Sequence, residues 1–371
     1  METPAASGLD GVTVAHTALS DVDGERGRLV IRGYAVETLA ERATFEDACA
    51  LMWNGAWPSP AERRSVQVLL GQARVDAFLM VPSLGDALLL SDGMEALRAS
   101  VAHMRASDTA SDREGLTGAI AVFASAWARA RVGHPIMPPD PSRSHAADCL
   151  AMLTGTEPLA AAVRGLDAYW GCVIDHGMNA STFAARVVAS TGSDTVSAIV
   201  AAIGALKGPL HGGAPGPVLD MLDSIGRAER AHSWLEAELA AGRRIMGMGH
   251  RVYRVRDPRA AALERAITAL EATGMSAERL ALARAVEREA ERLLTARHPE
   301  RPLHTNVEFY TAVLLEGIGI PRALFSPMFA ASRVAGWCAH VEEQRHVGRL
   351  IRPASVYVGP RPDNMGATTV S

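Results

Sequence analysis

Apolar residues recur at spacings of three and four along most of the chain, which is the pattern of helices packed against a core. One series runs from Val196 to Leu206, with Ser193 or Asp194 in place to cap the helix. The stretch Ser59–Glu62 has the form of a capping box with proline at the first helical position. A further helix is predicted to begin at Thr156, and two more are predicted over residues 276–297 and 328–344. The chain is therefore predicted to be mainly helical.

Strand signals are few and lie near the N-terminus. Residues 11–18 and 28–31 flank the turn-rich stretch 20–24, and this pattern predicts one β-hairpin. Strand and helix patterns do not alternate, which excludes a doubly wound parallel sheet. Residues 134–144 hold four prolines and are predicted to form an irregular loop. The predicted fold class is all-α with a short N-terminal β-hairpin.

Composition and charge narrow the function classes. The chain has 371 residues, of which 48% are hydrophobic and 21% charged, and this balance suits a globular core. The net charge is −4 with both signs interspersed, so we expect no nucleic-acid partner. No apolar run approaches the ~20 residues that span a bilayer, and no secretory signal pattern opens the chain. We therefore expect no membrane association.

The cysteines do not have the spacing of a metal site. Cys49, Cys149, Cys172 and Cys338 form no CxxC pair. Isolated cysteines of this kind are typical of reduced, buried thiols in a cytoplasmic protein. We expect a cytoplasmic location and no bound metal.

Three short motifs place ionisable side chains beside glycine or a tight turn. They are GPLHGG around His211, GMGHRVYRVRDPR around His250 and NVEFY around Glu308. Glycine lets the backbone approach a ligand closely, and a neutral imidazole can donate a hydrogen bond. Two histidines and one carboxylate form a minimal set for removing a proton next to a carbonyl and guiding the enol to an electrophile.

Each motif also has a purely structural interpretation, which the local sequence leaves open. His211 can serve only to hold its turn, and Arg254 and Arg259 can form a solvated face rather than grip phosphate or carboxylate. Glu308 lies among apolar and aromatic neighbours, where desolvation would raise the pKa of a general base, yet it can also be a half-exposed residue at a helix start. The run of glycines and histidine at 247–250 lacks the spacing of a dinucleotide motif.

Taken in order, the motifs resemble those of the citrate synthase family. They are GPLHGGA, GHRVY with a following DPR, NVEFY, SRVAGWCAHVEEQ and RPASVYVGP, preceded by GLDGVTVAHTALSDVDGERGRLVIRGY and DHGMNASTFAARVVAST. The resemblance covers nearly the whole chain and is strongest to the short bacterial form. Two positions depart from the family pattern. Glu308 stands where the family usually has aspartate, and Pro215 where its motif continues with asparagine.

The resemblance implies a role for each motif residue. His211 would hydrogen-bond the thioester carbonyl of acetyl-CoA, Glu308 would remove the methyl proton, and His250 would polarise the keto carbonyl of oxaloacetate. The implied binding residues are His176, Arg259, Arg333 and Arg352 for oxaloacetate, and Met246, Gly247, Met248, Gly249 and Arg254 for CoA.

The same resemblance implies the architecture and the partners. A large helical domain would comprise residues 1–213 and 317–371, and a smaller helical domain of residues 214–316 would close over the active site. Arg352 would reach the partner subunit's site from a C-terminal arm, so a homodimer is expected. The implied activity is the acyl transfer of the tricarboxylic acid cycle that makes citrate and CoA. No cofactor is expected, because arginines and histidines supply the positive field.

Two rival functions stay open. A 2-methylcitrate synthase would use propionyl-CoA with the same residues, and one methylene in an apolar pocket is worth only ~1–3 kcal/mol. Glu308 extends the base by on the order of 1.5 Å, which fits either a backbone that is set back or a slow, redirected site. A non-catalytic homologue with a regulatory or structural role rests on that substitution alone. We expect a working base and a preference for acetyl-CoA.

Overall fold

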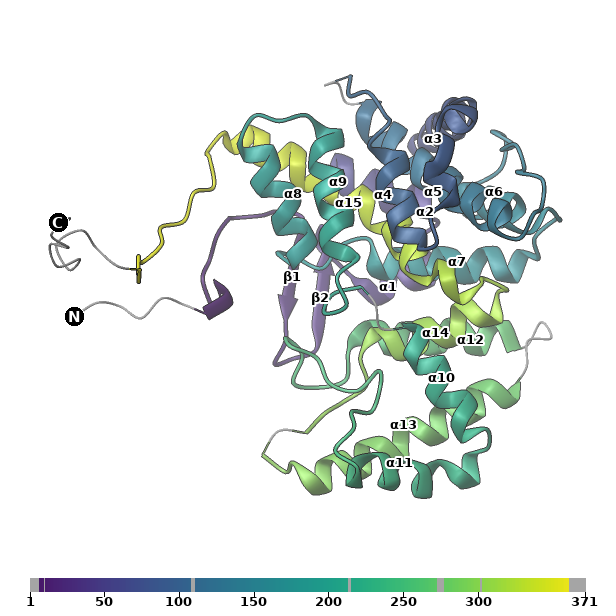
Figure 1. Cartoon of the computed structure of the whole chain (residues 1–371), viewed down its shortest axis with the longest axis vertical. Helices are drawn as coiled ribbons and strands as arrows, with labels where there is room; N and C mark the ends of the chain where they lie inside the picture. Colours follow the sequence, from purple (N-terminus) through teal and green to yellow (C-terminus); the bar gives the residue numbers. More distant parts are fainter. Residues whose placement is uncertain are drawn as a thin grey trace, which may run out of the picture.

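The structure is a computed structural model that describes residues 7–9, 11–107, 111–212, 215–271, 277–300 and 302–359. It is mainly helical, as the hydrophobic periodicity predicts (Figure 1). The helices are α1 (Val36–Arg42), α2 (Phe45–Asn54), α3 (Pro60–Met80), α4 (Gly93–Val101), α5 (Ser111–Arg131), α6 (His145–Thr154), α7 (Ala160–Val173), α8 (Ala180–Ser190), α9 (Thr195–Leu206), α10 (Pro215–Ile225), α11 (Ala231–Ala240), α12 (Pro258–Glu271), α13 (Ala277–Arg297), α14 (Val307–Gly317) and α15 (Phe325–Val347). Short 3-10 helices lie at Ser7–Leu9, Val81–Ser83, Gly85–Leu89, Ala228–Arg230 and Arg322–Leu324.

The larger body of the molecule is built around α5 and α15. Helix α5 packs on α3, α4, α6 and α15, and α15 also crosses α2, α7, α8 and α9. Almost every residue of α15 from Phe325 to Val341 is buried, because neighbours cover it on all sides. Its buried polar residues, among them Arg333 and His340, therefore need partners inside the protein.

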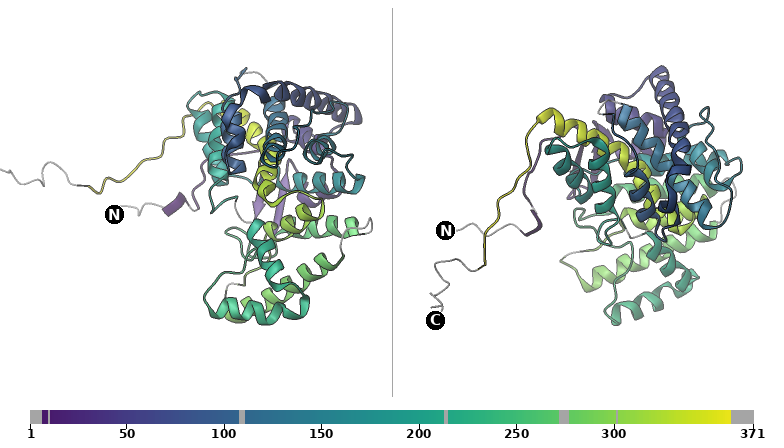
Figure 2. Two further views of the ribbon diagram at one scale, coloured as in Figure 1. Left: turned by 45° about the vertical axis from the view of Figure 1, so that its right-hand side comes forward. Right: turned by 45° about the horizontal axis from the view of Figure 1, so that its top comes forward.

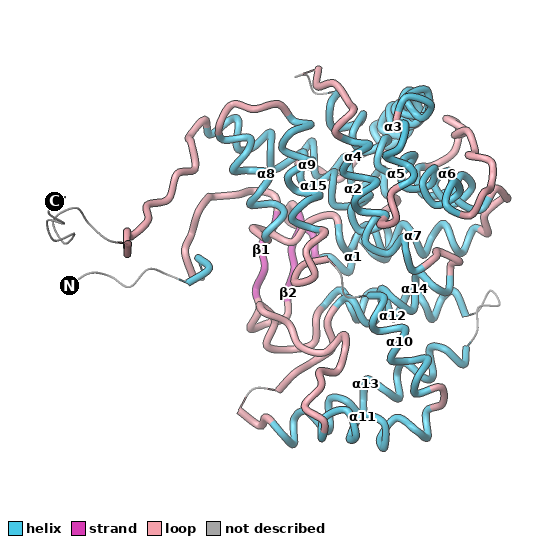
Figure 3. Tube along the Cα trace, in the orientation of Figure 1, coloured by secondary structure: helices cyan, strands magenta, loops and turns pink. Residues whose placement is uncertain are grey.

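A second group of helices lies at the lower end of the molecule. Helix α11 packs on α13, α10 packs on α14, and α12 packs on α14 while also contacting α1 and α7 of the body. Figure 2 shows the same separation from two other directions, and the described segments nearest the two ends of the chain leave the body on one side. Figure 3 shows the loops before α12 and before α14 running beside the tip of the hairpin, between the two groups.

The hairpin is present, but its first strand is not where the sequence pattern places it. β1 (Ser20–Asp23) pairs antiparallel with β2 (Arg28–Ile31), and β3 (Tyr34–Ala35) extends the sheet. Residues 11–18 are not a strand, and the stretch 20–24 holds β1 rather than the turn. The turn comes later because the Asp23 carboxylate accepts a hydrogen bond from the Arg26 amide at 3.0 Å and closes the chain there.

The helix starts follow the capping chemistry where that chemistry is strong. Ser59 and Glu62 form a reciprocal capping box at α3, and Asp194 caps α9 by accepting from the Ser197 amide. The predicted start at Thr156 is wrong, because α7 begins only at Ala160 without a side-chain cap. Proline at 158 favours an extended conformation at the residue before it, so the chain reaches α7 through a loop. Residues 134–140 are irregular, as the prolines predict.

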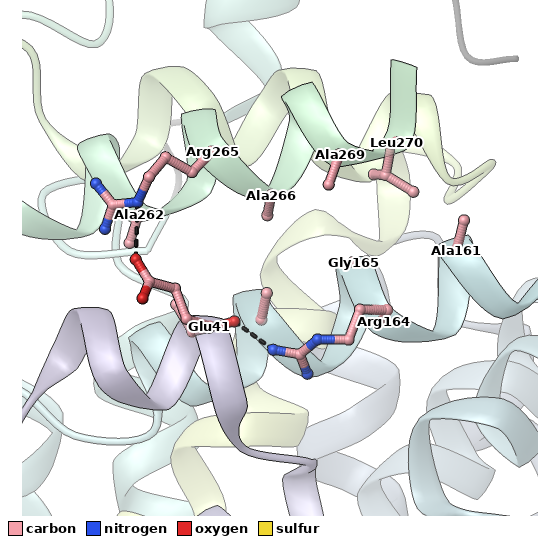
Figure 4. A pocket seen from close by; sticks show the side chains of 11 residues that line it. Glu41, Ala161, Arg164, Gly165, Ala262, Arg265, Ala266, Ala269 and Leu270 are labelled. Carbon is pink, nitrogen blue, oxygen red and sulfur yellow. Dashed lines mark hydrogen bonds and ion pairs between the residues drawn. The ribbon is translucent and has the colours of Figure 1, made fainter. Parts of the chain in front are cut away.

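The contact between the two helical groups is incomplete. A cavity of about 280 Å³ lies between α1, α7 and α12 (Figure 4). Small side chains line it on both sides, and Arg265 on α12 pairs with Glu41 on α1 at 2.9 Å across its mouth. Alanine and glycine thus let α12 meet the body without deep interdigitation.

We predict that Gly336→Ala destabilises the protein. A Cβ at this position of α15 would lie 2.2 Å from the carbonyl oxygen of Ile174, so helix and turn would have to separate. We expect a loss of about 2–3 kcal/mol in the free energy of unfolding, measured by urea denaturation. Gly115→Ala in α5 is the control, because no atom lies within 4 Å of its added Cβ. Equal stability of the two variants would contradict the packing argument.

Candidate active site

The turn after α9 holds His211. The His211 amide donates to Gly208 O at 2.9 Å, and a Cβ on Gly212 would lie 2.5 Å from Leu206 O, so this position requires glycine. The imidazole Nε2 accepts from the Ser181 amide at 3.3 Å and lies 2.8 Å from the Ser181 hydroxyl. A backbone N–H can only donate, so the proton of the neutral ring is on Nδ1.

Burial, assisted by the charge of Arg333, lowers the pKa of His211 to about 4. The ring is therefore neutral at physiological pH and offers a weakly acidic N–H donor.

His250 lies in a loop that is hydrogen-bonded to the chain just before α14. Gly247 and Gly249 have φ of 75° and 85°, in the left-handed region that favours glycine. The Gly249 amide donates to His304 O at 2.7 Å, and the Asn306 amide donates to Gly247 O at 2.9 Å. The chain before α12 is thus fastened to the chain before α14.

The ring of His250 is held in one tautomer. Its Nδ1 accepts from the amides of Val252 at 3.0 Å and Tyr253 at 3.1 Å, so Nε2 carries the proton. Burial, with the nearby charge of Arg259, lowers the pKa of His250 to about 4. This ring is a second neutral donor.

Glu308 lies in the first turn of α14. Its amide donates to the side chain of the N-cap residue Asn306 at 3.0 Å, and the Asn306 amide group donates to Gly249 O at 2.9 Å. The backbone of the carboxylate is thereby joined to the His250 loop. Burial raises the pKa of Glu308 to about 7; the Asp257 carboxylate adds to this rise, while Arg259 and Arg333 oppose it.

Arg259 and Arg333 are two buried guanidiniums at the same site. Burial opposes the charge of Arg259, yet Asp257 raises its pKa through bonds of 3.0 Å to Oδ1 and 2.7 Å to Oδ2. Asp257 also accepts from the Val307 amide at 3.2 Å, so it joins the first turns of α12 and α14. Arg333 donates to Val173 O at 2.6 Å. Burial and the charge of Arg259 lower the pKa of Arg333 to about 10, which leaves it charged at neutral pH.

His176 lies in the turn after α7. Its Nε2 is 3.1 Å from the Tyr253 hydroxyl, and its ring centroid is 5.5 Å from that of His250. Burial and the charges of Arg259, His250 and Arg333 hold its pKa well below the ordinary value. The structure thus brings together His176, His211, His250, Arg259, Glu308 and Arg333 from both helical groups.

The residues with an implied CoA role form the His250 loop or follow it closely. Met246 is 40% exposed, and Gly247 packs so closely on Phe309 that a Cβ would approach its ring to 2.8 Å. Arg254 lies 3.9 Å from the Glu25 carboxylate, beside a hollow of about 490 Å³ that Glu300 also lines.

Arg352 does not join the other site residues of its own chain. It is exposed on the extended segment after α15, which leaves the body in Figures 1 and 2. Pro215 is the first residue of α10.

Sequence reasoning missed several residues that orient the site. The Ser181 hydroxyl bonds His211 and accepts from the Trp337 indole at 3.2 Å, and Tyr253 meets His176. Ser181 lies two residues after the helix cap Asn179 and Tyr253 lies within the His250 motif, so position in or near a motif is the one signal the sequence offered.

Within the described residues, no group of three or more histidine, cysteine or acidic side chains has the geometry to hold a metal ion. In the same part of the chain, no helix is long and apolar enough to cross a membrane.

Comparisons with known proteins give one consistent result. A family model described as "Citrate synthase, C-terminal domain" matches residues 8–354. Citrate synthase of Haloferax volcanii is 37% identical over 95% of this chain and 96% of its own. The crystal structure of citrate synthase from Pyrobaculum aerophilum superposes with a TM-score of 0.86 at 34% identity, covering 97% of this chain and 94% of that one. A Thermoplasma acidophilum citrate synthase, solved with carboxymethyl coenzyme A and oxaloacetate, has a TM-score of 0.84 at 28% identity and 96% coverage of both chains.

We predict that Glu308→Gln stabilises the protein at high pH. The folded-state pKa of Glu308 is raised from 4.5 to about 7, so the wild-type residue favours folding below pH ~4.5 and loses that contribution as pH rises through 7. We expect the two proteins to be equally stable near pH 4.5 and the variant to be more stable by about 2 kcal/mol at pH 8.5, measured by urea unfolding. A stability difference that does not change with pH would refute the raised pKa.

Proposed function

The chain belongs to the citrate synthase family, and we propose that its buried arginines and paired neutral histidines join acetyl-CoA to oxaloacetate in a site completed by a second subunit. The enzyme is an acyltransferase whose acyl group becomes an alkyl group on transfer. It condenses acetyl-CoA with oxaloacetate, and water then hydrolyses the citryl thioester to citrate and CoA. The roles of its residues follow from their geometry and charge.

In the proposed first step, Glu308 removes a proton from the methyl group of acetyl-CoA. A base with a pKa of about 7 is ionised in a useful fraction at neutral pH and binds the proton strongly. His211 donates from Nδ1 to the thioester oxygen, where negative charge develops, because its Nε2 is occupied by Ser181. A ring with a pKa of about 4 stays neutral while it does so.

In the proposed second step, the enol carbon attacks the keto carbon of oxaloacetate. His250 donates from Nε2 to the keto oxygen, because its Nδ1 is held by two backbone amides. Arg259 and Arg333 bind the carboxylates, for which planar guanidiniums are well suited, and His176 orients the molecule. Residues Met246–Gly249 and Arg254 lie along the CoA.

The proposed chemistry needs no metal or cofactor, since the arginines and the two imidazole donors stabilise the developing charges. Exclusion of water favours closure of the 214–316 segment over the remainder, residues 1–213 and 317–371. Four free, buried cysteines support a cytoplasmic location.

We further propose a homodimer in which Arg352 enters the partner subunit's site. The segment that carries it is extended and leaves the apolar side chains of Leu350, Val356 and Val358 exposed. A second subunit would cover these side chains and receive the guanidinium.

The observation that carries the proposed function is the carboxylate of Glu308 beside two buried guanidiniums, at a pKa of about 7. We predict that CoA is released in the presence of oxaloacetate, faster from acetyl-CoA than from propionyl-CoA, and that Glu308→Gln lowers kcat about 10²–10⁴-fold. Wild-type kcat/KM should rise with pH through about 7, because the base must be ionised.

Glu316→Gln, near the end of the same helix, is the matched control and should retain activity. Preference for propionyl-CoA would identify a 2-methylcitrate synthase. Absence of CoA release from either thioester would refute the catalytic proposal and favour a regulatory or structural homologue.

The shared site has its own test, the coexpression of Glu308→Gln and Arg352→Gln chains. A heterodimer would hold one intact site, built from Glu308 of one subunit and Arg352 of the other. Random pairing of two inactive variants should then restore about 25% of wild-type activity. If Arg352 served its own chain, the mixture would stay as inactive as its parents.

A further inference from the structure

One end of β1 is fastened to the turn that carries His176. The Ser20 hydroxyl donates to Asp175 Oδ2 at 2.5 Å and accepts from the Gly177 amide at 3.0 Å. A single hydroxyl therefore bonds the residues on both sides of His176. Val22, the next residue on this face of the strand, lies within 3.4 Å of the position that a Cβ on Gly177 would take.

The other end of β1 is fastened to the loop that follows His250. The Arg254 amide donates to Gly24 O at 2.9 Å. A Cβ on Gly24 would lie 2.3 Å from the carbonyl oxygen of Val252, so only glycine permits the approach. Gly27 on the far side of the turn meets the side chain of Val255 in the same way, at 2.5 Å.

A buried network stiffens the His176 end. Asp175 is fully buried, and its Oδ1 accepts from His340 Nε2 at 3.1 Å. Arg186 Nη1 lies 3.0 Å from the other ring nitrogen of His340. Arginine can only donate, so that nitrogen carries no proton, and Nε2–H points at Asp175. Ser20 thus attaches the strand to an ordered chain of donors and acceptors rather than to a mobile turn.

The strand spans the distance between the two attachments. Four residue steps from Ser20 to Gly24 cover ~13 Å of extended chain, and pairing with β2 prevents the strand from shortening. The ring centroids of His176 and His250 are 5.5 Å apart. Besides the hairpin, Tyr253 links the two rings, because its hydroxyl lies 3.1 Å from His176 Nε2 and its amide donates to His250 Nδ1 at 3.1 Å.

We propose that the β1–β2 hairpin is a positioning element of the active site, in which Ser20 and Gly24 set the spacing of His176 and His250 around the keto acid. The inference rests on the proposed function, because it assigns both rings to oxaloacetate. Ser20 and Gly24 act through these histidines and need not touch the substrate. The hairpin is therefore a part of the catalytic apparatus that lies about 150 residues away in the sequence from the nearer histidine.

The first test removes the hydroxyl. Ser20→Ala should raise the KM for oxaloacetate about 10-fold and change the KM for acetyl-CoA less than about twofold, because the keto acid loses an oriented ligand. Ser20→Thr keeps the hydroxyl and should restore the wild-type value. Ser125→Ala is the matched control: it deletes another buried hydroxyl, on α5, that has no connection to the histidines.

The second test alters Gly24, the attachment at the other end of β1. Gly24→Ala forces the turn away from Val252 and should lower kcat about 10–100-fold through misplacement of His250, with Gly115→Ala as the unaffected control. The dissociation constant of oxaloacetate should be measured by calorimetry for every variant, together with a thermal unfolding curve.

The outcomes separate this inference from the proposed function. If wild type binds and turns over oxaloacetate while folded Ser20→Ala and Gly24→Ala match it within about twofold, the hairpin has no positioning role. A uniform loss of kcat in both control variants as well would also overturn it, since the effect would then reflect stability. If wild type shows no condensation, the proposed function fails, and weaker oxaloacetate binding by Ser20→Ala still decides the hairpin's role. Should one of the two variants not fold, the other tests the opposite anchor alone.

Discussion

The electrostatics of the candidate site depend on two buried guanidiniums that face it. Arg259 and Arg333 are nearly inaccessible to water and repel each other, so each needs a counter-charge inside the protein. Asp257 supplies it to Arg259 by two direct hydrogen bonds, and Asp175 favours the charge of Arg333 at longer range. With these partners the two guanidiniums stay charged inside the protein. The negative charges of a dicarboxylate can then balance the positive charge that remains at the site.

Burial and, after it, the charge of this pair set the protonation states of the other residues. Because the site is buried and already positive, a further proton on His176, His211 or His250 is unfavourable, and all three imidazoles remain neutral donors. The carboxylate of Glu308 feels burial more strongly than the attraction of the arginines, so it stays a base that can bind a proton near neutral pH. Burial thus lowers the pKa of the imidazoles and raises that of the carboxylate, which separates the hydrogen-bond donors from the base.

The sequence predicts which residues gather at the candidate site better than it predicts the contacts that hold them. Short motifs with glycine, proline or a helix cap indicate the local structure around three site residues, His211, His250 and Glu308. These residues could therefore be picked out from the sequence. The contacts that orient them join residues far apart: Ser20 and Asp175 are separated by 155 positions, and Asp175 and His340 by 165. Helical periodicity predicts α9 and α15. It gives no sign that Arg333, Trp337, His340 and Gln344 differ in role from their neighbours on the helix. In the fold they lie on one buried stripe: Arg333, Trp337 and His340 bond Val173, Ser181 and Asp175 beside the site, and Gln344 accepts from Arg186, which meets His340. The misplaced β1 has the same origin, since Ser20 looks like a turn residue until its distant partners are known.

The joint between the His250 loop and α14 fixes the backbone of Glu308, the residue that stands where the resemblance leads us to expect an aspartate. Asn306 caps α14 with its side-chain oxygen, donates its side-chain N–H to Gly249 O and its backbone N–H to Gly247 O. Glu308 is two residues further on, so a small displacement of α14 moves the base and the His250 loop as one unit. The extra methylene carries the carboxylate further from this shared backbone unit, so it changes the distance of the base from His250 as well as from His211. The turn that carries His211 follows α9 and lies outside the unit, and the small residues around the α7–α12 cavity leave room for the two helical groups to shift relative to each other.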